Sequence, residues 1–192
     1  MAGPTVLVLG GTGPAGICLI RELLYRNHSV VAFARTPSKI PEDLASNPLL
    51  EIIQGSLDDL EALSTAVSSS HTVLSLLGPT TTRKLDATIY STFYTSLFAL
   101  MREHSVRRIF AMGTLSISQP DDKFSLIRLF LVFIVRLFAN SAYRAILDIA
   151  RAFEEAGEGV DWTVFRIAGI PGGSDEKRGR RIGRKGRRLK DG

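Results

Sequence analysis

The stretch VLVLGGTGPAG, residues 6–16, places four glycines directly after a short apolar run. Gly10, Gly13 and Gly16 are spaced three residues apart, and Pro14 stands where the first turn of a helix would begin. A backbone without side chains lets a pyrophosphate approach the free amides and the partial positive charge at a helix N-terminus. The stretch therefore predicts a strand, a phosphate-binding turn and a helix; a bare structural turn is the alternative.

Short apolar runs recur along the chain and alternate with segments of helical spacing, for example residues 17–24 and 60–67. Runs without polar alternation are typical of parallel strands that are buried on both faces. We therefore expect an α/β fold, a Rossmann-type doubly wound parallel sheet in three αβα layers. The expected strands are 5–10, 29–34, 50–55, 72–78, 107–113 and 161–167.

The sequence FARTPSK, residues 33–39, follows the second expected strand and bears on the choice of nucleotide. At this position an NAD enzyme places a carboxylate that binds the ribose hydroxyls. This chain instead offers Arg35, Ser38 and Lys39, which suit the 2′-phosphate of NADP. NADP(H) is therefore the predicted cofactor, although both cations could also be solvated loop charges.

The positive net charge of the chain comes from its end. Residues 1–170 carry 15 Lys and Arg against 16 Asp and Glu, whereas residues 171–192 carry 9 against 3. We therefore expect a folded domain over 1–173 that does not bind nucleic acid and a disordered basic tail over 174–192. The tail is either simply solvated or binds a polyanion, including a nuclear-localisation role.

Length and composition limit the class of protein further. The 192 residues, 45% hydrophobic, contain a single cysteine, Cys18, which excludes a disulfide framework and a Cys-rich zinc site. The first residues lack the pattern of a signal peptide, and no run is long enough for a membrane span. We expect a cytoplasmic protein, monomeric or homodimeric.

The segment 124–140, FSLIRLFLVFIVRLFAN, is unusually apolar for a surface helix. At about 100° per residue its polar residues Ser125, Arg128, Arg136 and Asn140 fall within about ±60° of one another, which leaves the rest of the circumference apolar. Burial against the sheet or a dimer contact is the first interpretation. A lid over an apolar substrate pocket and contact with a membrane surface are the others.

These motifs together resemble a known family. GGTGPAG, ARTPSK, IIQGSLDD, VLSLLG, VRRIFAMGT and GVDWTVFRIAGI are similar to the atypical short-chain dehydrogenase/reductases of the NAD(P)H-binding, NmrA-like group, which includes biliverdin reductase B, a flavin reductase. The resemblance covers about residues 5–173 and implies a cofactor-binding set. That set is Gly10, Thr12, Gly13, Pro14, Ala15 and Gly16 at the pyrophosphate, Arg35 and Lys39 at the 2′-phosphate, Ser56 and Leu57 at the adenine, and Leu76, Leu77 and Gly78 along the ribose and nicotinamide. The family often has Asp where this chain has Ser56.

The catalytic Tyr-x-x-x-Lys pair of the larger dehydrogenase family does not occur in these 192 residues. The residues four positions after Tyr25, Tyr90, Tyr94 and Tyr143 are Ser29, Tyr94, Phe98 and Leu147. A proton for reduction would then come from water, the substrate or an isolated hydroxyl, for which Thr114 and Tyr143 are the candidates. Thr114 stands where the resemblance implies a Ser or Thr near the nicotinamide. The three histidines lack ligand spacing, so we expect no metal site.

The leading hypothesis is an NADPH-dependent reductase that transfers hydride to a small apolar or planar substrate such as a flavin, quinone or carbonyl compound. The alternatives are an NmrA-like NADP-sensing or interaction protein without turnover, and a non-redox tailoring enzyme on the same fold.

Overall fold

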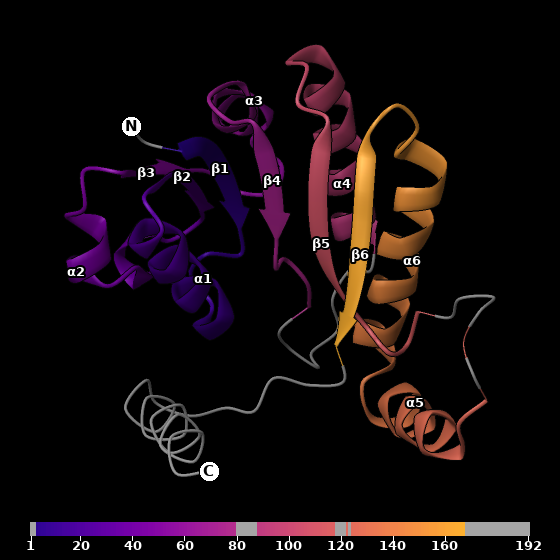
Figure 1. The fold of residues 1–192 in the computed structure, drawn as a ribbon. Coiled ribbons are helices and arrows are strands. Elements are labelled where there is room, and N and C mark those ends of the chain that lie inside the picture. Colours follow the sequence, from indigo (N-terminus) through magenta and orange to yellow (C-terminus); the bar gives the residue numbers. More distant parts are fainter. Residues whose placement is uncertain (1–2, 80–87, 118–121, 123, 168–192) are drawn as a thin grey trace, which may run out of the picture.

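The computed structural model describes residues 3–79, 88–117, 122 and 124–167, and the predicted basic tail lies outside them. Six parallel strands form one sheet in the order β3-β2-β1-β4-β5-β6 (Figure 1). This is the predicted Rossmann-type sheet, and each strand lies within two residues of its predicted start. The strands are β1 (Gly3–Leu9), β2 (His28–Ala34), β3 (Leu50–Gln54), β4 (Thr72–Ser75), β5 (Arg108–Thr114) and β6 (Asp161–Ile167).

Helices pack on both faces of the sheet and give the predicted three layers. Side chains of α3, α4 and α6 form the larger apolar core on one face, and those of α1 and α2 form a smaller core on the other. In the larger core, the ring of Phe153 lies 4.9 Å from those of Tyr94 and Phe98 and 5.7 Å from that of Trp162, centroid to centroid. The helices are α1 (Pro14–Tyr25), η1 (Pro37–Lys39, a 3-10 turn), α2 (Glu42–Ala45), α3 (Leu60–Ser68), α4 (Thr88–Glu103), α5 (Leu126–Phe138) and α6 (Asn140–Ala156).

Local sequence explains where the helices beside the site begin and end. Pro14 occupies the first turn of α1, where its missing N–H costs no hydrogen bond. After α1 the chain reverses through Asn27, which adopts a positive φ of 64° that asparagine tolerates well. The side chain of Asp59 caps α3 by accepting a hydrogen bond from the Ala62 amide at 3.0 Å. Pro14, Asn27 and Asp59 thus mark the start of α1, the turn after it and the start of α3.

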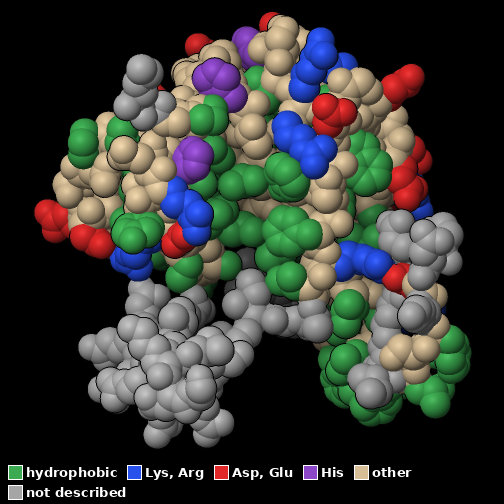
Figure 2. Space-filling view, viewed as in Figure 1, with side chains coloured by type: hydrophobic (Ala, Val, Ile, Leu, Met, Phe, Trp, Pro, Cys, Tyr) green, Lys and Arg blue, Asp and Glu red, His purple; other side chains and the backbone are tan. Residues whose placement is uncertain are grey.

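β5 and β6 correct the expectation that every strand is covered on both faces. Burial alternates along β5, and no residue of β6 is fully buried. Within the described ranges no helix covers the α1 side of these strands, because α4 and α6 both pack on the opposite face. Phe110, Met112, Phe165 and Ile167 therefore line an open apolar groove of about 630 Å3 beside α1. Figure 2 shows hydrophobic side chains gathered at the centre of this face.

α5 is the apolar helix that the sequence predicts, but it is not buried against the sheet as first expected. Leu126, Phe130 and Phe138 are 72%, 64% and 75% exposed. The reason is that α6, and not α5, occupies the sheet surface beside β5, while α5 packs against α6 beyond the carboxyl ends of the strands (Figure 1). None of the helices in the described residues is by itself long and apolar enough to cross a membrane; Leu129–Phe138 and α6 pass that test only as a pair bent by 115°.

Gly16 lets the first turn of α1 pack directly on the turn that precedes it. A Cβ at this position would lie 2.2 Å from the carbonyl oxygen of Gly10 and 2.6 Å from the Cα of Gly11. Both neighbours are backbone atoms, so no side-chain movement could relieve the clash. The β1–α1 turn therefore depends on glycine at this position.

We expect Gly16→Ala to lower the free energy of unfolding by about 1–3 kcal/mol because the turn and helix must separate. Gly13→Ala is the matched control, since a Cβ there would have its nearest neighbour at 3.6 Å. Urea denaturation followed by circular dichroism measures both. Equal stability of the two variants would contradict the packing argument.

Candidate functional site

A cavity of about 250 Å3 opens at the carboxyl ends of β1, β2 and β4. The strand order reverses between β1 and β4, and open α/β sheets bind ligands at such a switch point. The Leu76 amide donates a hydrogen bond to the Leu9 carbonyl oxygen at 2.9 Å, so the chain segments that follow these two strands lie side by side. The predicted residues in the lining are Gly10, Thr12, Gly13, Arg35, Lys39, Leu57, Leu76, Leu77 and Gly78.

The glycine turn forms one wall of this cavity. Gly10 has a φ of 79°, and a Cβ on it would lie 2.9 Å from the Leu76 carbonyl carbon, so only glycine fits there. Gly13 is the N-cap of α1 and has no side chain to accept hydrogen bonds from the first-turn amides. Those amides, with the positive end of the helix dipole, suit an anionic phosphate.

Three residues of the predicted pyrophosphate set do not line the cavity. Pro14 is exposed in the first turn of α1, and Gly16 is buried under it. Ala15 faces the open apolar groove on the β4–β6 side. Through their side chains these residues shape the helix start, and any contact with a ligand would be through the backbone.

Two cations also line the cavity. Arg35 follows β2 and Lys39 ends η1, and both are exposed. Among the described residues of the lining there is no carboxylate. Ser38, between the two cations, is exposed and lies outside the lining. The glycine turn and the cations together suit an anionic ligand.

Ser56 and Leu57 separate in the structure. Leu57 lines the cavity, whereas Ser56 is exposed and donates a hydrogen bond to the Asp58 carboxylate. That hydrogen bond lowers the pKa of Asp58. Ser56 is therefore absent from the described cavity lining, Leu57 is present in it, and the adenine contacts of both stay predictions.

Two tyrosines of α4 belong to the site and are not among the residues that the sequence predicts, because neither is followed by lysine four positions later. Tyr90 lines the cavity and donates a hydrogen bond to the Gly78 carbonyl at 3.3 Å. Burial raises the pKa of Tyr90, and the charge of Arg35 opposes that rise. The sequence pattern that could have indicated them is the spacing of Tyr90 and Tyr94 by one helical turn, which places both on the same side of a helix.

Tyr94 holds the chain segment after β4 in place through its hydroxyl group. Its hydroxyl lies 2.6 Å from the hydroxyl of Ser75 and 3.4 Å from the Leu77 carbonyl oxygen. The Leu77 amide in turn donates to the Ser75 hydroxyl at 3.3 Å. Tyr94 is fully buried, and burial raises its pKa to about 12. This network fixes the segment whose residues Leu76, Leu77 and Gly78 line the cavity.

A second, apolar cavity of about 130 Å3 adjoins the first and shares Leu76, Leu77 and Gly78 with it. Thr114 lies in its lining at the end of β5, where its hydroxyl oxygen accepts a hydrogen bond from the Ser116 amide at 3.3 Å. Among the described lining residues it carries the only polar side chain. Tyr143, the other candidate hydroxyl, is half-buried in α6 and lines neither cavity.

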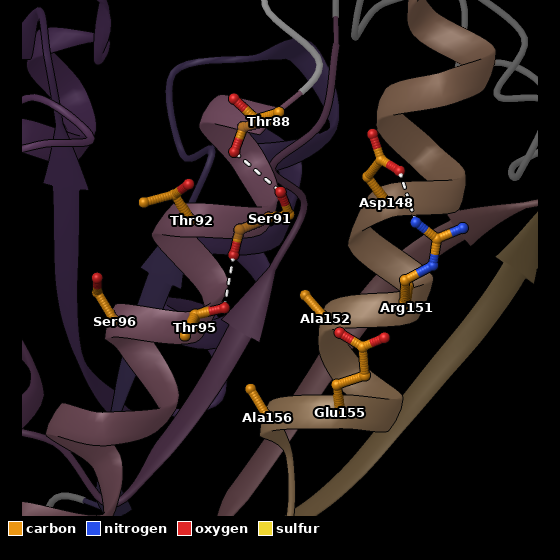
Figure 3. Close-up of a pocket in the computed structure, with 10 residues that line it drawn as sticks. All are labelled: Thr88, Ser91, Thr92, Thr95, Ser96, Asp148, Arg151, Ala152, Glu155 and Ala156. Carbon is orange, nitrogen blue, oxygen red and sulfur yellow. Dashed lines mark hydrogen bonds and ion pairs between the residues drawn. The ribbon is translucent and has the colours of Figure 1, made fainter.

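A larger groove of about 610 Å3 lies between α4 and α6 and contains none of the predicted site residues (Figure 3). Ser91 and Thr95 donate their hydroxyls to carbonyls one turn back in α4, and Asp148 pairs with Arg151 at 3.6 Å. These four polar side chains thus interact within their own helices. Nor do His, Cys, Asp and Glu form any group of three suited to a metal ion within the described ranges.

Sequence comparison finds relatives of this chain. A family model described as NAD(P)H-binding matches residues 10–192. This chain is 40% identical to a 3 beta-hydroxysteroid dehydrogenase/Delta 5-->4-isomerase from Mycobacterium tuberculosis over 68 residues, which are 35% of its length. It is 38% identical to a 3-beta-hydroxysteroid dehydrogenase from Mycolicibacterium neoaurum over the same length. The matched stretch spans only 17% and 18% of these two relatives.

Solved structures with a similar fold include nucleotide-binding proteins. A wide-type short-chain dehydrogenase/reductase from Veillonella parvula in complex with NADP has a TM-score of 0.69 and 16% identity, over 90% of this chain and 72% of that one. An anaerobillin reductase from Escherichia coli O157:H7 has a TM-score of 0.63 and 14% identity, over 90% and 77%. Likeness at these identities establishes the fold.

The raised pKa of Tyr94 predicts a specific loss of stability in base. The unfolded chain ionises near pH 10, whereas the folded chain keeps the proton until about pH 12, so unfolding becomes easier across that window. We expect this residue to contribute a fall of about 2–3 kcal/mol in the free energy of unfolding.

Urea denaturation of the wild type and of Tyr94→Phe between pH 9 and pH 12 measures this contribution. The free energy of unfolding should fall less steeply with pH in the variant than in the wild type. At neutral pH the same variant should lose about 1 kcal/mol with its hydrogen bonds. Tyr25→Phe, at a tyrosine that is 85% exposed, is the control. Identical slopes in all three proteins would exclude the proposed burial effect.

Proposed function

The chain belongs to the NAD(P)H-binding family, and on that premise we propose that it is an NADP(H)-dependent oxidoreductase. The proposed reaction is reduction of a small apolar or planar substrate, such as a flavin, quinone or carbonyl compound. The observation that carries the proposal is one continuous site, with two cations and a glycine turn at one end and an apolar cavity with a single hydroxyl at the other.

The choice of NADP over NAD rests on charge. Arg35 and Lys39 would hold the 2′-phosphate, and the described part of the cavity lining offers no carboxylate for a free ribose hydroxyl. The amides after Gly13 would hold the pyrophosphate, and Leu57 would pack against the adenine. Assignment to the NmrA-like branch of the family is part of this proposal and rests on the sequence motifs.

The chemistry is supplied by the nicotinamide, which when bound delivers a hydride from its C4 atom. The protein's part is orientation and exclusion of water. Leu76, Leu77 and Gly78, fixed by Tyr94, would set the ring at the boundary between the two cavities, and Ile149 and Val164 would enclose the substrate. The Thr114 hydroxyl would donate a hydrogen bond to a substrate oxygen and stabilise charge that develops there.

The cofactor assignment predicts the effect of removing one cation. Arg35→Ala should raise the dissociation constant of NADPH about 10-fold to 100-fold and leave that of NADH nearly unchanged, because a charge-assisted hydrogen bond is lost. Fluorescence titration measures both constants. Arg107→Ala, at an exposed arginine before β5 and so at the opposite edge of the sheet, is the control. Equal affinity for NADPH and NADH in the wild type would refute NADP preference.

Turnover is tested by an acceptor screen with flavins, quinones and aromatic carbonyl compounds, followed as NADPH oxidation. Thr114→Val should lower kcat about 10-fold to 100-fold at unchanged NADPH affinity, because the hydroxyl acts on the substrate alone. Thr95→Val, in the groove between α4 and α6, should match the wild type. Tight NADPH binding without oxidation by any acceptor would support the nucleotide-sensing alternative, which the missing Tyr-x-x-x-Lys pair favours.

A further inference from the structure

α5 presents apolar side chains on most of its circumference. Its exposed residues are Leu126, Leu129, Phe130, Leu131, Phe133, Ile134, Val135, Leu137 and Phe138, and Phe124 directly before it is 80% exposed. Of these, Phe133 is 60% and Leu137 is 62% exposed. A helix that packs on one neighbour needs only one apolar stripe, and α5 has far more apolar surface than α6 covers.

The charge around α5 has a single sign. Residues 124–147 contain Arg128, Arg136 and Arg144 and no Asp or Glu. The nearest preceding described carboxylate, Asp122, is neutralised by Arg166, whose guanidinium donates two hydrogen bonds of 2.6 and 2.7 Å to it. The described charged side chains on α5 and in the first turns of α6, Arg136 and Arg144, are therefore both positive.

Two exposed arginines accompany this apolar surface. Arg136 lies in the last turn of α5, and Arg144 lies in α6, which follows it. A helix with an apolar majority and exposed arginines suits a bilayer interface, where the aliphatic stems remain among the acyl chains and the guanidinium groups reach the phosphates.

The length of α5 decides between lying on a membrane and crossing it. Thirteen residues span about 20 Å, which is shorter than the roughly 30 Å of a bilayer core. α5 also lies away from the sheet, beyond the carboxyl ends of the strands (Figure 1).

We propose that α5 is an interfacial anchor that docks this protein on the surface of an anionic lipid bilayer. The apolar side chains of α5 enter the acyl region, and Arg136 and Arg144 pair with anionic headgroups. An anionic bilayer surface accommodates both the apolar side chains and the arginines, whereas an apolar contact with a second copy would leave the arginines without a partner of opposite charge. The anchor is independent of the proposed reductase activity.

Co-sedimentation of the full chain with phosphatidylcholine vesicles, with and without added phosphatidylserine, tests the proposal. We expect binding to the mixed vesicles, weakened by salt and by Arg136→Gln combined with Arg144→Gln. Phe130→Ser combined with Phe133→Ser should reduce binding roughly tenfold per side chain. Tyr25→Ser combined with Leu60→Ser removes exposed apolar groups elsewhere and should bind like the wild type.

A second measurement separates insertion of α5 from attraction of basic residues elsewhere. Phe133→Trp in a Trp162→Phe background places the single tryptophan in α5. Its emission should shift to the blue with mixed vesicles and be quenched by brominated lipid. Absence of quenching would overturn the proposal. So would a lipid-free dimer that dissociates in the Phe130 and Phe133 variant, because a second copy would then be the occupant of α5.

Discussion

The site depends on the pairing of β1 with β4. The hydrogen bond from the Leu76 amide to the Leu9 carbonyl holds the glycine turn against the segment after β4. That approach leaves no room for a Cβ on Gly10, and the positive φ of this residue turns the chain into α1. The pairing of β1 with β4 and the conformation of Gly10 therefore position both walls of the cavity at the glycine turn.

The site has a charged part and an apolar part. The cations lie at the carboxyl end of β2, next to the edge strand, whereas the apolar cavity lies between β5 and α6. The three residues after β4 belong to both cavities and are held by the buried pair of Ser75 and Tyr94. A ligand with a charged end and a planar apolar end matches this order, and the nicotinamide nucleotides are such ligands.

Two apolar surfaces of the molecule lack partners among the described residues, and their chemistry differs. The described residues that line the groove over β4, β5 and β6 carry no charge, and the Arg108 guanidinium lies 4.3 Å from the ring of Phe110, one of them. α5 combines a mostly apolar surface with the exposed Arg136 and with Arg144 in the next helix. For α5, the positive charges favour contact with an anionic surface.

The sequence by itself determined the strands, the glycine turn and the cations, because apolar runs, missing side chains and charge are local properties. It could not place Tyr90 and Tyr94 at the site, nor separate Ser56 from Leu57, because these outcomes depend on which helix packs beside which strand. The apolar composition of β5, β6 and α5 likewise predicted burial. Only the tertiary structure decided that one face of those strands and most of α5 stay open, since burial needs a partner as well as an apolar side chain.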